Sequence, residues 1–398
     1  MAGAALRFAP VLLVALAIGE GYAAPGVSPP GAKGEGAPVL VWPLPPDPPR
    51  IQYLDALRGS GDFKKKPGFW KKLLLGADRD PGVALRKPYG VATDSAGRVY
   101  VTDTGLGTVV VFDSAARAVR LLGQKGQVRL QTPIGIALDA RDRVFVSDAD
   151  LDRVFCFGEG GEVLLALGAD QKLQNPAGIA IDRGRGRLYV ADSHLHRIFV
   201  YGTDGGFVGA WGKRGSGKGE FNFPTNLALD RQGNLYVVDT GNFRVQVLDP
   251  EGRFLSMFGE AGDAPGRFHR PKGIALDSEG HIYVADAAFN NFQVFDPAGK
   301  LLLFVGVVGK EPGQFWLPAG IAIDGSDRIR VVDQVNARVQ VFQYLKDKGA
   351  GPPSAPPAAG PGSARSAGGP AGASGEGIAK TCSRHAPREC EVVVRQPE

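Results

Sequence analysis

The chain has 398 residues, with 46 Lys and Arg against 41 Asp and Glu, which gives a formal net charge of +5. This mild basicity does not by itself indicate a nucleic-acid-binding protein. The three cysteines and five histidines leave few ligands for a metal centre.

Residues 1–23 have the features of a secretory signal peptide. Arg7 precedes an apolar run from Val11 to Ile18, and small residues follow at the cleavage spacing. The run is too short to span a bilayer. We therefore expect the mature protein to be periplasmic or secreted.

The next segments connect this signal to the main domain. Residues 24–49 are rich in Pro and Gly, which predicts a linker or an extended arm. Ile51 to Leu57 reads as a strand. Phe63 to Leu75 is basic and aromatic, so it fits either an anionic membrane or a connector that buries Trp70. The connector fits better, because the chain must join this strand to the repeats that begin at Pro88.

Residues 50–347 contain six copies of one pattern. Each copy has a Pro, a Gly-Ile-Ala-like run, an Asp, a turn, an Ile/Val-Tyr-Val-like run and a second Asp. The copies start 43 to 48 residues apart, and a period of this length indicates repeated supersecondary units. They begin at Pro88, Pro133, Pro176, Pro224, Pro271 and Pro318.

Each copy contains four short β-branched or aromatic runs separated by turns of Gly, Asp and Pro. The runs are apolar at most positions, as in strands buried on both faces. Four-stranded antiparallel sheets packed around an axis form a β-propeller. The sequence thus predicts an all-β, six-bladed propeller. The sixth copy lacks a fourth strand, and we expect Ile51 to Leu57 to supply it and close the ring.

The repeated motifs resemble a known family. Pro-x-Gly-Ile-Ala-x-Asp, Gly-x-Ile-Tyr-Val-x-Asp and Asn-x-Arg-Val-x-Val-Phe are similar to NHL repeats over roughly residues 50–345. The resemblance implies the six-bladed NHL propeller. NHL and related propellers bind RNA, act as scaffolds or extracellular sensors, or carry metal-dependent lyase or lactonase chemistry. The resemblance therefore implies no single function.

One face of a propeller carries the loops from each fourth strand into the next blade. Here these loops are basic and contain aromatic residues, a combination that suits an acidic polymer or an anionic protein. The alternative is a solvated rim with the aromatics packed under the blades. The candidate binding residues are Lys213, Arg214, Lys218, Arg267, His269, Arg270 and Lys272. Arg86, Lys87, Lys125, Arg129 and Lys310 lie in the other loops, and the aromatics are Phe221, Phe223, Phe268, Phe315 and Trp316.

The loops between second and third strands share this face and depart from the family pattern Asp-x-x-Asn-x-Arg. Three adjacent blades have leucine at the Asn position, namely Leu106, Leu151 and Leu195. Exposed leucines would form an apolar patch for a partner. Leucines that fold inward would only fill the space between loops. Both alternatives stay open.

Two aspartates recur at fixed places in every copy. A ring of carboxylates could hold a metal, but repetition in all six copies favours a structural role, with loop amides and a nearby arginine as partners. The second aspartates are Asp103, Asp148, Asp192, Asp239, Asp286 and Asp333, and the arginines five residues later are Arg153, Arg197, Arg244 and Arg338.

Residues that break the repeat are more informative. Asn226 replaces a Gly, and Arg330 replaces a Tyr or Phe. A charge between blades needs a partner, so we expect Arg330 to reach a carboxylate or the rim, where it could tie down the closing strand. His194 and His196 form a weak metal-binding pair.

The innermost strands supply no cluster of carboxylates or histidines, and no nucleophile constellation occurs. We therefore expect a non-catalytic, monomeric binding or scaffold module without a cofactor, which presents a basic face to a protein or an acidic envelope polymer. The alternative is a metal-dependent hydrolase or lyase. Nucleic-acid binding would fit only a cytosolic chain, and membrane contact has weak support.

The C-terminal part differs in composition. Residues 348–378 are of low complexity and predict disorder, and residues 379–398 form a short tail. Cys382 and Cys390 are expected to pair as a disulfide in an oxidising compartment. Cys156 lies in a predicted third strand and is expected to be a buried small hydrophobe.

Overall fold

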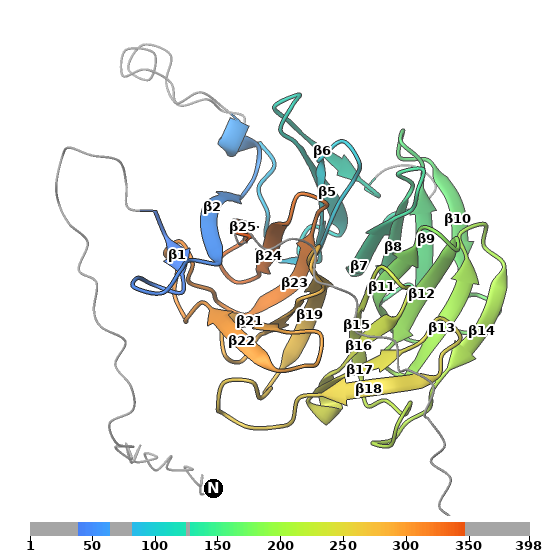
Figure 1. The fold of residues 1–398 in the computed structure, drawn as a ribbon. Coiled ribbons are helices and arrows are strands. Elements are labelled where there is room, and N and C mark those ends of the chain that lie inside the picture. The colour runs from blue at the N-terminus through green and yellow to red at the C-terminus, as the bar shows by residue number, and fades with distance from the viewer. Residues whose placement is uncertain (1–38, 64–81, 125–127, 347–398) are drawn as a thin grey trace, which may run out of the picture. The chain divides into compact units, whose positions relative to one another are not determined.

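The computed structural model describes residues 39–63, 82–124 and 128–346. Within these ranges the chain forms six antiparallel sheets arranged as the blades of a propeller (Figure 1). The predicted signal peptide, most of the linker, Trp70, Lys125 and the tail with Cys382 and Cys390 lie outside the described residues. In the part that is described, no helix has the length and apolarity needed to cross a membrane.

Blades 1 to 5 each consist of four consecutive strands, counted from the axis outward. Blade 1 contains β3 (Pro88–Thr93), β4 (Val99–Asp103), β5 (Thr108–Asp113) and β6 (Ala118–Leu122). Blade 2 contains β7 (Pro133–Leu138), β8 (Val144–Asp148), β9 (Arg153–Phe157) and β10 (Val163–Leu167). Blade 3 contains β11 (Pro176–Asp182), β12 (Arg187–Asp192), β13 (Arg197–Gly202) and β14 (Phe207–Trp211). Blade 4 contains β15 (Pro224–Leu229), β16 (Leu235–Asp239), β17 (Arg244–Leu248) and β18 (Phe254–Phe258), with the 3-10 turn η2 (Thr240–Asn242). Blade 5 contains β19 (Pro271–Leu276), β20 (Ile282–Asp286), β21 (Asn291–Phe295) and β22 (Leu301–Val305).

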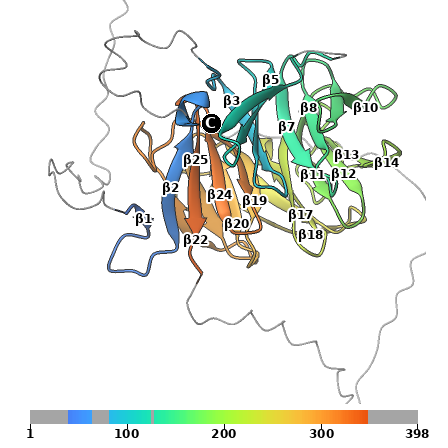
Figure 2. The ribbon, with the colours of Figure 1, turned by 90° about the horizontal axis from the view of Figure 1, so that it is seen from above.

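Blade 6 joins the two ends of the described chain. Its inner strands are β23 (Pro318–Ile323), β24 (Arg328–Asp333) and β25 (Arg338–Tyr344). Strand β2 (Ile51–Leu57) pairs antiparallel with β25, from Ile51 opposite Tyr344 to Leu57 opposite Val339, and Figure 2 shows the two strands side by side. The predicted closing strand is therefore confirmed.

The structure adds a fifth strand to blade 6. Strand β1 (Val41–Trp42) lies in the segment expected to be a linker and pairs with β2. The Trp42 ring packs edge-on against Phe342, with centroids 5.8 Å apart. The chain then continues past β2 into the 3-10 turn η1 (Ser60–Phe63).

The hydrophobic core lies between blades. Six clusters of buried side chains each take residues from two neighbouring blades, so the core forms a ring. The second strands are buried along their whole length in blades 1, 2, 4 and 5. Burial on both faces explains why these runs are apolar at nearly every position, since each buried Val or Ile contributes about 1.5–3 kcal/mol.

Two singular residues have the environments expected for them. Cys156 in β9 is fully buried, and burial raises the pKa of its thiol to about 11. Arg330 in β24 is also buried, and its guanidinium donates to the Asp324 carboxylate at 2.8 Å. Tyr283 occupies the corresponding position in blade 5, and its hydroxyl donates a hydrogen bond of 3.0 Å to Asp277. The expected carboxylate partner is confirmed, and it belongs to the same blade as the arginine.

Candidate functional site

The loop face is the face of the propeller that carries the loops between blades and the loops between second and third strands. Its loops are held by the six second aspartates, which are all fully buried at the ends of the second strands. Asp103 accepts hydrogen bonds from the backbone amides of Arg86 at 2.7 Å and Lys87 at 3.0 Å. Asp286 accepts from the amides of His269 at 2.8 Å and Arg270 at 3.1 Å. The carboxylates therefore hold the residues that lead into each blade, and their predicted structural role is confirmed.

The predicted arginine partners bind these carboxylates in two blades only. Nε of Arg244 lies 2.8 Å from Asp239, and Nε of Arg338 lies 2.7 Å from Asp333. The prediction is wrong for Arg153, whose guanidinium donates to a backbone carbonyl. It is also wrong for the exposed Arg197, which makes no ion pair among the described residues.

Loop length explains this difference. The loop before blade 4 spans residues 212–223, and its carbonyls at Ser216, Gly217 and Glu220 accept from the Arg244 guanidinium at 2.7–3.0 Å. The loop before blade 3 spans only residues 168–175. A buried guanidinium needs all its donors satisfied. The shorter loop does not wrap around Arg197, and that side chain faces solvent.

The three leucines of the loop face are half-buried. Leu106 packs against the cluster between blades 6 and 1, Leu151 against that between blades 1 and 2, and Leu195 against that between blades 2 and 3. Each leucine thus covers a different interface between blades. This arrangement favours the space-filling alternative over a shared exposed patch.

Several cations of the outer rim have partners. Lys213 lies 3.2 Å from Glu220, and Arg267 lies 3.0 Å from Glu260. The Lys218 amine stands 5.3 Å from the centroid of a phenylalanine ring. Exposed pairs of this kind contribute ~0–1 kcal/mol each. They nevertheless neutralise charge, so the rim is less basic than the sequence suggests, although Arg214 is exposed without an ion pair in the described part.

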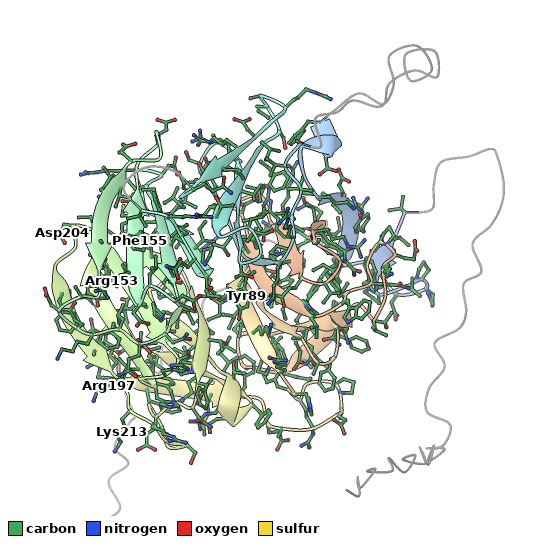
Figure 3. All side chains as sticks on the ribbon, turned by 180° about the vertical axis from the view of Figure 1, so that it is seen from behind. Tyr89, Arg153, Phe155, Arg197, Asp204 and Lys213 are labelled. Atoms are coloured by element: carbon green, nitrogen blue, oxygen red, sulfur yellow. The ribbon has the colours of Figure 1, made fainter. Side chains whose placement is uncertain are left out.

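A second group of cations lies near the axis. Lys272 is the second residue of β19, and its amine stands 5.1 Å from the ring centroid of Tyr89, the second residue of β3. Blade 6 lies between these two blades and has only the buried Ala319 at the same position. Because alanine is small, the lysine can reach past it. Figure 3 shows Tyr89 toward the middle of the ring and Lys213 near its edge.

Arg270 and Lys87 complete this group. Each directly precedes the proline that begins its strand, and both are exposed. Burial, and then the charges of Arg270 and Lys87, lower the pKa of Lys272 to about 8. Within the described ranges, no carboxylate forms an ion pair with any of the three cations. We call Lys87, Arg270, Lys272 and Tyr89 the mouth cluster.

Sequence reasoning placed Arg270, Lys272 and Lys87 on the basic face but did not separate them from the rim. It also missed Tyr89. The available signal was the position after each Pro, where Lys272 is the only charged residue among the six copies. The contact itself joins blades 5 and 1 and could not be seen in one repeat.

The mouth cluster stands at one end of an axial cavity of about 270 Å³. The innermost strands line this cavity, and its polar side chains are those of Tyr89, Thr93, Arg183 and Asn226. No carboxylate or imidazole is among the lining residues. Arg183 follows β11 at the opposite end of the cavity and donates to the carbonyl of Leu138 at 3.1 Å. The cavity is therefore lined by a cation at this far end, whereas the mouth cluster contributes only Tyr89 to its lining.

Three of the loop aromatics are structural. Phe221, Phe268 and Phe315 are fully buried, whereas Phe223 and Trp316 are 44% and 43% exposed. The packing alternative therefore holds for the first three. The two exposed rings add apolar surface to the loop face, as a partner-binding surface requires.

The histidines do not form a metal centre in the described residues. His196 is buried, and its Nδ1 accepts the backbone amide of Phe223 at 3.0 Å. Burial, followed by the nearby Arg214 charge, lowers the pKa of His196. His194 and His269 are exposed. Across the described ranges, no group of three or more His, Cys, Asp or Glu residues is placed to hold a metal ion.

Comparisons with known proteins agree with this architecture. A sequence family described as a 6-bladed beta-propeller matches residues 172–246, and the NHL repeat family matches residues 268–295. No curated protein matches the sequence of this chain.

Solved structures with a similar fold have diverse activities. A gluconolactonase from Xanthomonas campestris is 16% identical, with 78% of this chain and 99% of that chain covered and a TM-score of 0.52. An auxiliary nutrient binding protein from Bacteroides thetaiotaomicron is 15% identical, with 66% and 70% covered and a TM-score of 0.53. A virginiamycin B lyase from Staphylococcus aureus is 13% identical, with 65% and 95% covered and a TM-score of 0.50.

Identities this low show a common fold and no common activity. The two family matches fall in blades 3 to 5, and the same motif recurs in every other blade. The ring of six sheets and the matched repeats together identify the chain as a six-bladed β-propeller of the NHL-repeat type.

Proposed function

We propose that this propeller is a non-catalytic binding module that engages an anionic protein or an acidic envelope polymer through its loop face. The mouth cluster is the observation that carries the proposal. Three cations gather near the axis, two of them on backbone positions fixed by buried aspartates, and they have no acidic partner in the described residues. Complementary charge on a partner would remove their mutual repulsion.

The alternative of a metal-dependent hydrolase or lyase has less support. Divalent metal ions in such enzymes are held by carboxylates, imidazoles or thiolates. The lining of the axial cavity offers hydroxyl, amide and guanidinium groups instead. The likeness to a lactonase and a lyase concerns the fold, so it adds no ligand set to this chain.

The location of the protein is part of the proposal. The apolar run after Arg7 supports export, and an exported module would meet proteins and acidic polymers of the cell envelope before nucleic acid. A non-catalytic role also fits the repeated features of the fold, since the six second aspartates hold the loops by hydrogen bonds to backbone amides. The candidate surface comprises the mouth cluster and the rim cation Arg214, which has no acidic partner in the described part of the chain.

Retention on acidic polymers tests this function. The full chain, and a variant with Lys87→Glu and Arg270→Glu, would be passed over immobilised poly-glutamate and dextran sulfate at low salt. A matched control carries Arg141→Glu and Arg231→Glu, at exposed positions in turns of the opposite face. We expect the parent and the control to be retained and the loop-face variant to be lost. Equal retention of all three proteins, or none for the parent, would overturn the proposal.

A further inference from the structure

We infer that the mouth cluster is a binding site for one oxyanion group, a carboxylate or a phosphate, held by Lys272 between Arg270 and Lys87 and against the ring of Tyr89. This inference rests on the proposed function and deepens it. It assigns the acidic group of the partner to a defined position at the end of the axial cavity.

The first argument is the uniqueness of Lys272. The residue after the strand-initiating Pro is Tyr89, Ile134, Ala177, Thr225 or Ala319 in the other five copies. All five are uncharged, so the fold does not need a cation there. A charge at a largely buried position opposes folding unless it is paired. A residue that adds such a charge to one blade only is therefore a candidate for binding rather than for structure.

The second argument is the missing partner. Among the residues that the structure describes, the Lys272 amine lies 5.1 Å from the centroid of the Tyr89 ring and has no acidic partner. An aromatic face attracts an ammonium group but accepts no strong hydrogen bond from it. The three N–H donors of the amine thus remain available. An oxyanion can accept from them while its other oxygens face the neighbouring cations.

The third argument is the fixed geometry of those cations. The amide of Lys87 donates to Asp103 and that of Arg270 donates to Asp286, and both carboxylates are fully buried. The backbones of the two residues are therefore held in place, so both side chains extend from fixed points around Lys272. A guanidinium binds a planar or tetrahedral oxyanion through two parallel hydrogen bonds, and Arg270 can act in this way beside the Lys272 amine.

A second basic hollow in the molecule differs from the mouth cluster, because acidic side chains lie among its cations. It has a volume of about 130 Å³ between blades 1 and 2 and includes Arg98, Arg120 and Arg141. There Arg98 binds Asp94, and Glu159 stands 3.6 Å away. Acids therefore compensate its charge. The lack of an acidic partner therefore distinguishes the mouth cluster from this second basic hollow.

Titration of small anions into the full chain tests the site. Sodium phosphate and sodium glutarate would be added at constant ionic strength in a chloride buffer, and the heat of binding recorded. Lys272→Met keeps the unbranched side chain and removes the charge, so we expect the affinity to fall by about tenfold or more. Arg270→Gln should weaken binding in the same direction. The rim variant Lys213→Met should bind like the parent.

Each outcome separates the site from the general function. Tighter binding of phosphate or of glutarate would show which group the partner supplies. Equal affinity of the parent and Lys272→Met, with thermal unfolding confirming that both are folded, would overturn the site, as would no binding of either anion to the parent. Equal retention of the parent and Lys272→Met on the immobilised acidic polymers would leave the proposed function standing without this site. Binding of small anions by a parent protein that is not retained on the polymers would support the site and overturn the proposed function.

Discussion

Replacing Lys272 with Met should stabilise the folded propeller at neutral pH. In the folded state the pKa of this lysine falls from 10.5 to about 8, mainly because the amine is buried and secondarily because of Arg270 and Lys87. At about 1.4 kcal/mol per pKa unit, holding the charge in this place costs about 3 kcal/mol. The pKa is lower in the folded state, so the cost is complete below pH about 8 and shrinks as the pH rises toward 10.5.

Part of this gain is offset. The contact of the ammonium with the Tyr89 ring is lost, and such contacts contribute ~0.5–2 kcal/mol. The aliphatic part of Met replaces that of Lys272 in the same volume. We therefore expect a net stabilisation of about 1–3 kcal/mol, which corresponds to a rise of several degrees in the midpoint of thermal unfolding.

The assay is urea and thermal unfolding of the full chain in a buffer without phosphate or carboxylates, at about pH 7 and about pH 10. Lys213→Met is the control, because its amine is exposed and paired with Glu220; it should change stability by no more than ~0.5 kcal/mol. Two results would refute the reasoning. One is a loss of stability in Lys272→Met, and the other is a gain of equal size at both pH values.

Three further predictions concern other measurable properties. Lys272 should be the fastest lysine to react with a small amine reagent at about pH 7.5, because about a quarter of it is neutral there, and uniform labelling of all lysines would contradict this. The hydrogen bond with Asp277 raises the pKa of His281. The stability that this pair contributes is therefore complete below about pH 6.5 and is lost as the pH rises through the folded-state pKa. His281→Gln should destabilise the fold more at about pH 5.5 than at about pH 8.5, as measured by urea unfolding. Arg338→Met should cost about 3–5 kcal/mol, because it leaves the fully buried Asp333 without its cation, and a loss below about 1 kcal/mol would show that the pair is not needed.

The fold could be predicted because its determinants are local and repeated. In every copy the proline begins the innermost strand and the second aspartate ends the next strand, so one repeat explains all six. The closing strand followed from a missing strand and a spare run at Ile51 to Leu57, and pairing with β25 bears this out. Strand β1 was missed because two residues between prolines carry no periodicity.

The candidate site could be predicted only as a set of loops. Whether Arg197 pairs with its aspartate depends on the length of the loop from the preceding blade, which the repeat motif does not encode. The inward packing of Leu106 depends on the neighbouring blade. The contact of Lys272 with Tyr89 depends on the small Ala319 between them. Each of these properties belongs to the ring and not to one repeat.

The charges of this propeller therefore divide into two kinds. The repeated charges that are buried have partners: Arg338 and Arg244 are enclosed by carboxylates and carbonyls, and removing any of these groups should weaken the fold. The charge at Lys272 occurs once, lacks an acidic partner in the described chain and lowers stability where it stands. Features that oppose folding in this way are expected at functional sites. An anion that restored the missing partner would stabilise the fold and occupy the site in the same step.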